Sequence, residues 1–416
     1  MLHKPEAMPP TRRILMLAYW YPPENESGAL RPFRFCKYLP KYGFESLVVA
    51  ASSAGTMPEA GRVYRAPDAR NVGRMANSIA WMTRMLERVL PYNDRLEWVP
   101  HAVACAGSLL DCKAIRVIVS SSPPVATHVA ALYLKQRHGT RWIADFRDPL
   151  AGNPFRTRRM GVPYDFVLER SIVSCADAII LNTDAAFDTL AQRYPGQRSK
   201  MHLIWNGYDP EDQFQAVRIE PDRSKTIAHF GSIYGGRHPG ELLRSLQRLL
   251  KQGALQERGV RVNLVGSIDH DQPWIKHSSF SEMASAGRLQ FTDRAIPRDQ
   301  VRALMSETDY LLLLDINELG AALQVPGKLF EYMRIGRPIL AFTTKESPVD
   351  RILRQGGIPH VCVYPEEPAG DIDRKVLTLL SMPTEPVAPS AWFEHQFDAE
   401  RQAEALADIV AKLWRA

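Results

Sequence analysis

The chain has 416 residues, of which 45% are apolar and 24% are charged, a balance typical of a soluble globular protein. A single hydrophobic core rarely serves more than about 250–300 residues, so the length predicts two domains. No run approaches the roughly 20 consecutive apolar residues of a membrane span, and the first residues lack the apolar centre of a secretory signal. The 5 cysteines are scattered without CxxC spacing, which favours free thiols in a reducing cytoplasm and no zinc site.

The charge is unevenly distributed along the chain. Residues 1–200 hold 27 basic and 17 acidic residues, a net of +10, whereas residues 201–416 hold 25 and 29, a net of −4. A basic first half suggests an anionic partner such as a membrane surface or a lipid phosphate. Nucleic acid is disfavoured as a partner, because no recognised nucleic-acid motif appears and stacking aromatic residues do not alternate with the basic ones.

The first predicted elements form a strand–helix–strand unit. Apolar runs predict strands at 12–19 and 44–51, and a helix lies between them after a loop rich in Pro, Asn, Ser and Gly. Gly28 precedes that helix, where a glycine lets the backbone approach a ligand closely. An ordinary turn glycine explains the same position equally well.

Residues 54–100 interrupt this pattern. Within them, residues 74–90 carry apolar side chains at spacings of three and four, with Arg74, Arg84 and Arg88 on other faces. This pattern predicts a basic amphipathic helix that either packs on its own domain or touches a membrane surface.

The parallel-sheet pattern then returns. Strands are predicted at 114–124, 141–149 and 176–183, with helices at 125–138 (which contains His128), 165–175 and 184–193. The strand 141–149 ends in Asp145, Arg147 and Asp148. Ligands of open α/β sheets bind at the carboxyl ends of strands, so this charged cluster is a candidate site. A structural Asp–Arg pair is the alternative.

The second half begins again in the same way. After a strand and a turn at 201–212, a strand at 225–230 leads into a loop that contains Gly231, Gly235, Gly236 and Arg237. This loop resembles a phosphate loop, although it is neither a dinucleotide fingerprint nor a P-loop. Further strands are predicted at 260–266, 288–292, 310–315 and 361–364, and helices at 240–251 and 398–414.

The stretch 325–342 predicts a loop, a short helix and a buried strand. A Gly-Lys pair (Gly327 and Lys328) opens the helix, and free N–H groups, the positive end of the helix dipole and an ammonium together suit an anionic ligand. Glu331, one turn later, points back toward the same end and suits ribose or sugar hydroxyls. An ordinary loop–helix–strand unit with a solvated Glu331 is the alternative.

Seven segments in this order resemble the retaining GT-B glycosyltransferases of glycosyltransferase family four, and in particular the bacterial branch that builds cell-surface polysaccharides on lipid carriers. They include Tyr-Trp-Tyr-Pro-Pro, Ala-Asp-Phe-Arg-Asp-Pro and Gly-Lys-Leu-Phe-Glu-Tyr, and they occupy residues 19–31, 121–128, 144–149, 176–183, 205–209, 229–237 and 327–340. The resemblance implies two Rossmann-like domains that face a central cleft, with a C-terminal helix that returns to the first domain. The expected parts are an acceptor domain at 1–208, a donor domain at 209–390 and the returning helix at 391–416.

The resemblance also implies roles for individual residues. Arg237 and Lys328 would neutralise the donor diphosphate, Glu331 would hold the ribose, and Gly28 would lie at the diphosphate from the other side of the cleft. Arg147 and Asp148 occupy the place where many members carry a histidine that touches the sugar. The expected donor site is completed by Gly231, Gly235, Gly236, Gly327 and Leu329, and the acceptor or sugar side by Asn25, Ser27, His128 and Asp145.

One departure from the family pattern concerns the first glutamate of its E-x7-E motif. That position is Leu323 here, and Glu318 is off register, so the motif does not identify the residue that recognises the donor sugar. The expected activity is transfer of a sugar from a nucleotide-sugar, UDP-sugar by preference, to a lipid-linked glycan, without metal or cofactor, by a cytoplasmic protein peripheral to the inner face of the membrane. A nucleotide-sugar epimerase and a non-catalytic nucleotide-sugar-binding scaffold are the alternatives.

Overall fold

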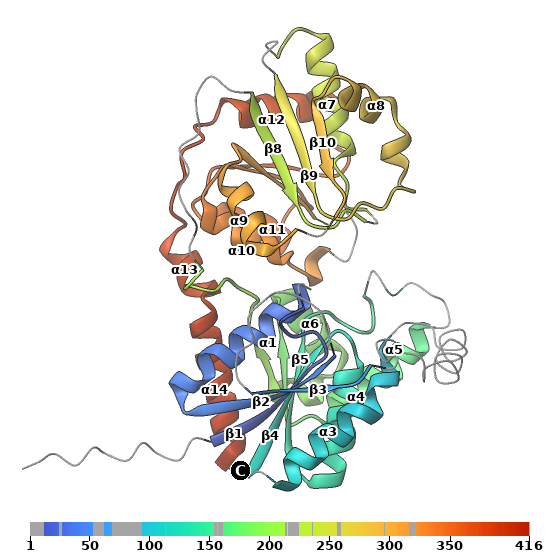
Figure 1. The fold of residues 1–416 in the computed structure, drawn as a ribbon, viewed down its shortest axis with the longest axis vertical. Coiled ribbons are helices and arrows are strands. Elements are labelled where there is room, and N and C mark those ends of the chain that lie inside the picture. Colours follow the sequence, from blue (N-terminus) through green and yellow to red (C-terminus); the bar gives the residue numbers. More distant parts are fainter. Residues whose placement is uncertain are drawn as a thin grey trace, which may run out of the picture. The chain divides into compact units, whose positions relative to one another are not determined.

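The chain forms two compact units in a computed structural model (Figure 1). Unit 1 comprises Met1–Asp209 and Asp398–Ala416, and unit 2 comprises Pro210–Phe397. The structure describes residues 12–24, 27–52, 62–68, 94–112, 114–153, 156, 161–212, 214, 224–234, 236–255, 259–294, 296–315 and 321–415. Among these residues, no helix has the length and hydropathy that a membrane crossing needs.

Unit 1 is a parallel sheet with helices on both faces. Its strands are β1 (Arg12–Ala18), β2 (Phe44–Ala51), β3 (Arg62–Ala66), β4 (Ile115–Ser122), β5 (Arg141–Phe146), β6 (Ala178–Leu181) and β7 (Met201–Leu203). Its helices are α1 (Ser27–Tyr38), α3 (Val99–Cys112), α4 (Ala126–His138), α5 (Gly161–Cys175), α6 (Asp184–Arg193) and α14 (Ala399–Arg415). The strand order β3-β2-β1-β4-β5-β6-β7 reverses direction between β1 and β4.

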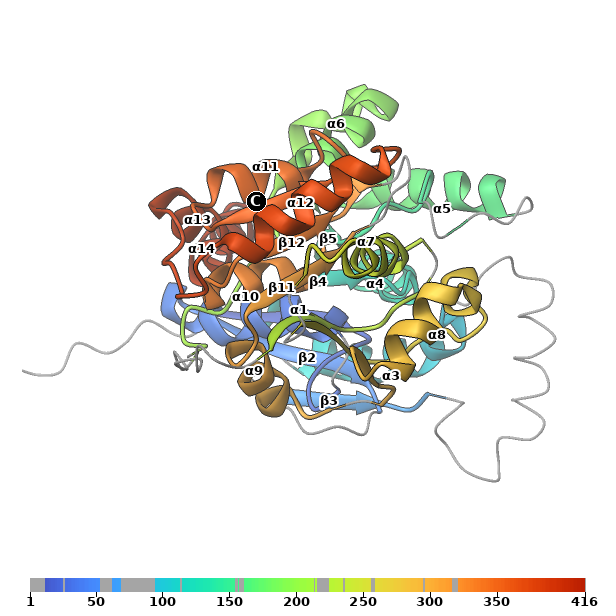
Figure 2. The same ribbon diagram turned by 90° about the horizontal axis from the view of Figure 1, so that it is seen from above.

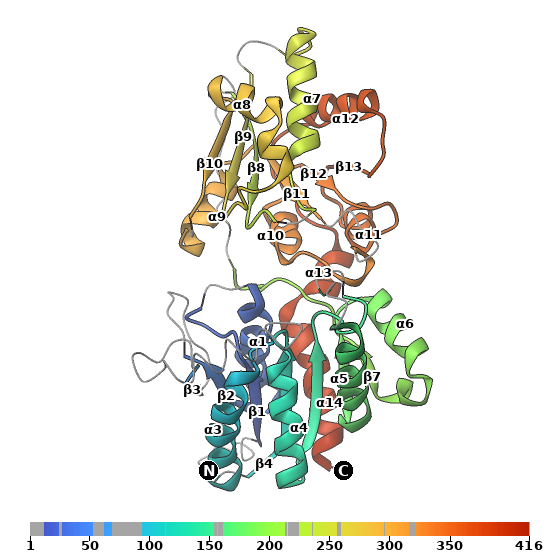
Figure 3. The ribbon, with the colours of Figure 1, turned by 90° about the vertical axis from the view of Figure 1, so that its right-hand side faces the viewer.

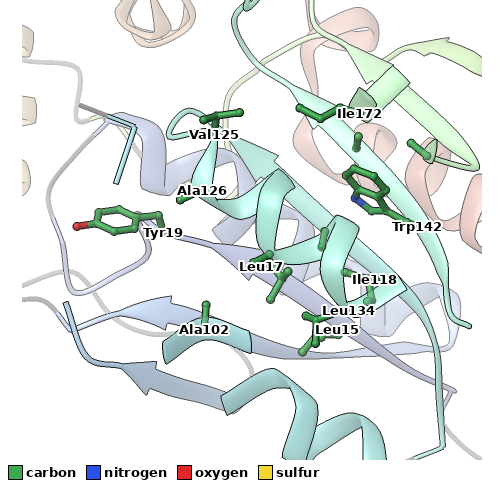
Figure 4. Close-up of a cluster of buried hydrophobic side chains, with 14 of the residues drawn as sticks. Leu15, Leu17, Tyr19, Ala102, Ile118, Val125, Ala126, Leu134, Trp142 and Ile172 are labelled. Atoms are coloured by element: carbon green, nitrogen blue, oxygen red, sulfur yellow. The ribbon is translucent and has the colours of Figure 1, made fainter. Parts of the chain in front are cut away.

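The alternation of side chains along each strand gives unit 1 two cores. Leu15 and Leu17 of β1 point into a core with Ile118 and Trp142, which α3, α4 and α5 cover (Figure 4). Strands of a parallel sheet are buried on both faces, which is why they read as continuous apolar runs. The residues between them, such as Ile14 and Met16, belong to the opposite core. The buried members of that opposite core on the two covering helices are Phe35, Cys36 and Tyr38 of α1 and Ala399, Ala403, Leu406, Ala407, Ile409 and Val410 of α14.

The last helix of the chain therefore completes unit 1 (Figure 3). α14 packs against α1, and Leu406, Ile409 and Val410, which share one face of the helix, are buried there. The prediction started this segment at residue 391. In the structure α13 (Ala391–Phe397) belongs to unit 2, where Phe393 and Phe397 pack on Phe330, and the return to unit 1 begins at Asp398.

Unit 2 repeats the architecture with six strands. They are β8 (Lys225–Phe230), β9 (Val260–Val265), β10 (Leu289–Thr292), β11 (Tyr310–Leu314), β12 (Ile339–Phe342) and β13 (His360–Val363). The helices are α7 (Gly240–Lys251), α8 (Ser278–Ser285), α9 (Arg298–Ser306), α10 (Gly327–Ile335), α11 (Pro348–Gln355), α12 (Ala369–Ser381) and α13. The order β10-β9-β8-β11-β12-β13 places the reversal between β8 and β11, and α7 and α12 lie side by side over one face (Figure 2).

Two elements of unit 1 were absent from the predicted set. β3 lies within the stretch 54–100 and α3 begins at its end, and neither this strand nor this second helix was expected. β3 is a short edge strand whose half-exposed arginines and tyrosine obscure the apolar alternation, so only its pairing with β2 identifies it. The basic helix predicted at 74–90 lies outside the described residues.

Candidate functional site

The site in unit 2 is built on the N-terminus of α10. Leu329, Phe330 and Met333 are fully buried and fix one face of the helix, while Gly336, at φ 77°, ends it in the left-handed conformation. Gly327 is exposed and Lys328 follows it in the first turn. The first N–H groups of a helix have no intrahelical acceptor, so this end carries a partial positive charge that attracts anions.

Lys328 contacts a buried histidine, His229, at the carboxyl end of the sheet. Its Nζ lies 3.1 Å from Nε2 of His229, and Nδ1 of His229 lies 2.9 Å from the carbonyl oxygen of Leu312. His229 is on β8 and Leu312 is on the neighbouring β11, so the pair sits at the strand-order reversal where such sheets bind ligands. Burial, with a contribution from Arg237, lowers the pKa of Lys328 to about 7, and burial beside Lys328 lowers the pKa of His229 well below its usual value.

Gly231 is favoured both by its backbone conformation and by the close approach of this lysine. A Cβ at residue 231 would lie 2.2 Å from Nζ of Lys328, and the backbone there has φ +129°, which favours glycine. Arg237 follows on the same loop, with its NH1 3.0 Å from the hydroxyl of Tyr234 and its guanidinium over that ring. The structure therefore brings Gly231, Arg237 and Lys328 together. Gly236 is an exposed member of the same loop, and Gly235 lies outside the described residues.

Glu331 is paired within the protein. Its carboxylate accepts a hydrogen bond from Arg298 at the start of α9, and Arg298 also lies 3.6 Å from Asp212. A charge-assisted hydrogen bond of this kind is strong and directional, so Arg298 is suited to orient Glu331. Leu329, by contrast, has a fully buried side chain, and its N–H bonds to the carbonyl of Pro326.

The segment before α10 holds a polar side chain that was not predicted. Leu323 lies in the short turn η5 (Ala321–Leu323), and the next residue, Gln324, is 8% exposed. Nε2 of Gln324 has no hydrogen-bond partner within the part of the chain that the structure describes. A buried amide without a partner is costly, and such groups point to a ligand or a water molecule.

In unit 1, Arg147 connects the first turn of α1 to the end of β4. Its guanidinium donates to the carbonyls of Gly28 and Pro123, and its Nε lies 3.1 Å from the carbonyl of Ser122. A Cβ at Gly28 would lie 2.7 Å from NH1 of Arg147, so the glycine is explained by the approach of the arginine. Asp148 is half-buried beside Arg147, and its carboxylate is one of the charges that act on that guanidinium.

Asp145 and His128 lie in the interior of unit 1. Asp145 is fully buried and accepts hydrogen bonds from Arg31 and from Ser121. The interaction is the structural Asp–Arg pair that was the alternative interpretation, although its arginine is Arg31 rather than Arg147. His128 is also fully buried, 2.8 Å from Oγ of Ser120, and burial lowers its pKa to about 3.

Asn25 and Ser27 are the remaining residues predicted for the acceptor or sugar side. Asn25 lies outside the described residues, and so does the side chain of Ser27, the first residue of α1. Within the described ranges, no group of three or more His, Cys, Asp and Glu residues is arranged to hold a metal ion. The predicted residues thus form a cationic cluster in unit 2, whereas in unit 1 Arg147 makes structural hydrogen bonds to backbone carbonyls.

His229, Arg298 and Gln324 were missed by the sequence analysis. A histidine near the carboxyl end of a strand, shortly before a Gly-rich loop, was the available signal for His229. No local pattern identifies Arg298, because its partner Glu331 is 33 residues away on another helix.

Comparisons with known proteins agree with this architecture. The sequence profile of Glycosyltransferase Family 4 matches residues 33–212. A search of curated proteins found no match. Among solved structures, the chain is similar to a sucrose-phosphate synthase from Thermosynechococcus elongatus, with a TM-score of 0.65 and 13% identity over 97% of this chain and 99% of that one.

Two further structures are similar over nearly their whole lengths. HepE from Anabaena, in complex with UDP and glucose, gives a TM-score of 0.62 and 14% identity over 96% of this chain and 100% of that one. WaaG is described as a glycosyltransferase involved in lipopolysaccharide biosynthesis. It gives a TM-score of 0.59 and 14% identity over 95% of this chain and 99% of that one.

The fold is that of the GT-B proteins, with two Rossmann-like units and a C-terminal helix that returns to the first of them. The predicted resemblance to glycosyltransferase family four is confirmed by the family match over residues 33–212. Family match and fold together support glycosyltransferase function.

Proposed function

We propose that the protein is a retaining, metal-independent glycosyltransferase that moves a sugar from a nucleotide-sugar, by preference a UDP-sugar, to a lipid-linked glycan acceptor. The observation that carries this proposal is the cationic cluster at the reversal point of the unit 2 sheet. Lys328 at a helix N-terminus, Arg237 and the Cβ-free Gly231 together suit a diphosphate. The preference for UDP is supported by the similar structure that holds UDP and glucose.

The proposed chemistry uses these cations on the leaving group. The bond from the anomeric carbon to the diphosphate breaks, and a bond from the acceptor hydroxyl oxygen to the same face of that carbon forms. The hydroxyl proton passes to an oxygen of the departing diphosphate. Negative charge grows on that diphosphate in the transition state, so Lys328 and Arg237 stabilise it most when it forms. No carboxylate pair at glycosidase spacing was found in the sequence, which favours this front-side route.

Glu331 and Gln324 supply the polar contacts that a nucleotide-sugar needs. We assign the ribose hydroxyls to Glu331, oriented by Arg298. We assign a sugar hydroxyl to Gln324, since the side chain of Leu323 is apolar and the buried Nε2 of Gln324 has no hydrogen-bond partner among the described residues. In unit 1 we propose that Arg147 holds the backbone segments around Gly28 and Ser122 in place, because its guanidinium contacts three backbone carbonyls.

The basic first half of the chain bears on both the acceptor and the membrane. The net charge of +10 on residues 1–200 favours an anionic lipid-linked acceptor and peripheral attachment to the inner face of the cytoplasmic membrane. Cell-surface polysaccharide assembly is the process that we propose, and the similarity to WaaG supports it.

A panel of nucleotide-sugars incubated with and without a lipid-linked acceptor tests the proposal. A new glycolipid, whose anomeric configuration in NMR matches that of the donor, is the expected result. An altered sugar without acceptor would instead indicate an epimerase, and binding without any product would indicate a scaffold. Addition of EDTA should leave the rate unchanged if no metal takes part, and a loss of activity would contradict metal independence.

A further inference from the structure

His229 carries a hydrogen-bonding pattern that determines its tautomer. The backbone of both Leu312 and Gly231 interacts with the ring. A backbone carbonyl can only accept, and Nδ1 lies 2.9 Å from the oxygen of Leu312, so we assign the ring proton to Nδ1. In the neutral ring, Nε2 then carries a lone pair. Lys328 Nζ, 3.1 Å from Nε2, must be the donor of that second hydrogen bond.

The two side chains are held rigidly against one another. His229 is 1% exposed within β8, and the N–H of the next residue, Phe230, donates to the hydroxyl of Tyr332 on α10 at 3.0 Å. Tyr332 and Lys328 share that helix, so the Tyr332 contact fixes α10 against β8. The absence of a Cβ at Gly231 leaves room for Nζ on the other side.

We propose that His229 is a positioning residue that directs Lys328 toward the diphosphate of a nucleotide-sugar. This inference rests on the proposed function. An ammonium has three N–H bonds at tetrahedral angles, and a fixed acceptor for one of them sets the directions of the other two. Those two are then available to two diphosphate oxygens. A lysine ammonium without this acceptor rotates freely, and the loss of its rotational entropy on binding lowers the affinity for the diphosphate.

The arrangement also links donor binding to protonation. The charged and titratable groups that act on Lys328 are Arg237 on the preceding loop, Glu331 on its own helix and His229 on β8. Burial and Arg237 lower the pKa of Lys328 to about 7, so a large fraction of the side chain is neutral near neutral pH. A bound diphosphate favours the ammonium, and the lone pair of His229 favours it as well.

Three substitutions separate positioning from packing. His229→Gln keeps an acceptor oxygen near the place of Nε2, His229→Asn keeps only the contact with Leu312, and His229→Phe keeps only the ring shape. The matched control is His360→Asn, because His360 lies at the amino end of β13 in the same sheet and its Nδ1 is 2.8 Å from the carbonyl of Ile358. Affinity for UDP, GDP and inorganic pyrophosphate is measured by calorimetry at about pH 6 and about pH 8, on either side of neutrality.

We expect His229→Phe and His229→Asn to weaken UDP binding about tenfold or more, the usual effect of losing a hydrogen bond to a charged group. The loss should be larger at the higher pH, because without the lone pair Lys328 gives up its proton more readily. His229→Gln should recover most of the affinity, and His360→Asn should change nothing. Unchanged affinity and pH dependence in His229→Asn would overturn the inference while the proposed function stands.

The failure of the proposed function has a different signature. If the wild type binds none of the three probes, the donor site itself is refuted. Should the variants fail to fold, the wild type provides a direct test by nitrogen NMR with labelled histidine. A His229 ring with its proton on Nδ1, perturbed on addition of UDP, is expected, and a proton on Nε2 would refute the positioning role.

Discussion

Replacement of Lys328 by methionine tests the donor site most sharply, because binding and stability should change in opposite directions. Methionine has nearly the same length and no charge. Loss of the ammonium removes charge-assisted contacts to the diphosphate, worth about 3 kcal/mol together, so UDP affinity should fall about 100-fold. Turnover should fall at least as much, since the charge on the leaving group increases in the transition state.

The stability of the same variant should rise. The pKa of Lys328 is lowered from 10.5 to about 7 in the folded protein, so between these values the unfolded chain binds more protons and wild-type stability increases with pH. The folded state therefore carries a penalty that is full below about pH 7 and disappears toward pH 10.5. After allowance for partial solvent screening, Lys328→Met should gain about 2 kcal/mol near pH 6, and less at higher pH.

Calorimetric titration with UDP and thermal unfolding at several pH values measure the two effects. About 2 kcal/mol corresponds to a rise of about 4–8 °C in Tm for a unit of this size. Lys276→Met is the control, since Lys276 is exposed at the end of a short turn in unit 2, and it should change neither quantity. A variant that binds UDP normally, or one that is less stable than the wild type at pH 6, would refute the reasoning.

Three further substitutions test the other assignments. Glu331→Ala should weaken UDP binding about tenfold in the same titration, as the loss of a charged hydrogen-bond partner predicts; equal affinity would exclude a ribose contact. Arg147→Met should lower the free energy of unfolding in urea by about 2–4 kcal/mol, because it leaves the carbonyls of Gly28 and Pro123 without this donor, while the backbone N–H of residue 147 still donates to Ser122. Normal stability with lost turnover would show instead that Arg147 acts on a substrate. Gln324→Leu should raise Tm and leave UDP affinity unchanged while weakening the UDP-sugar; an equal loss for both ligands would place Gln324 at the nucleotide.

The sequence by itself determined the architecture of the protein. Apolar runs separated by helical periodicity predict two successive α/β halves, because strands of a parallel sheet are buried on both faces and their helices on one. The Gly-Lys pair at 327–328 predicted the N-terminus of a helix and a site suited to an anion, since N-terminal N–H groups and the helix dipole depend only on local structure. The apolar stripe of the last helix was equally local, and its burial in unit 1 follows from it.

Only the tertiary structure decided which polar groups meet. His229 and Lys328 are 99 residues apart, and their contact requires β8 and β11 to be neighbours with α10 packed over them. The same holds for Arg31, which pairs with the buried Asp145, 114 residues away. It also holds for Arg147, whose guanidinium donates to the backbone carbonyl of Gly28. Local patterns identify residues able to bind an anion. A side chain's partner, its burial and hence its pKa depend on strand order and packing, which bring distant segments together.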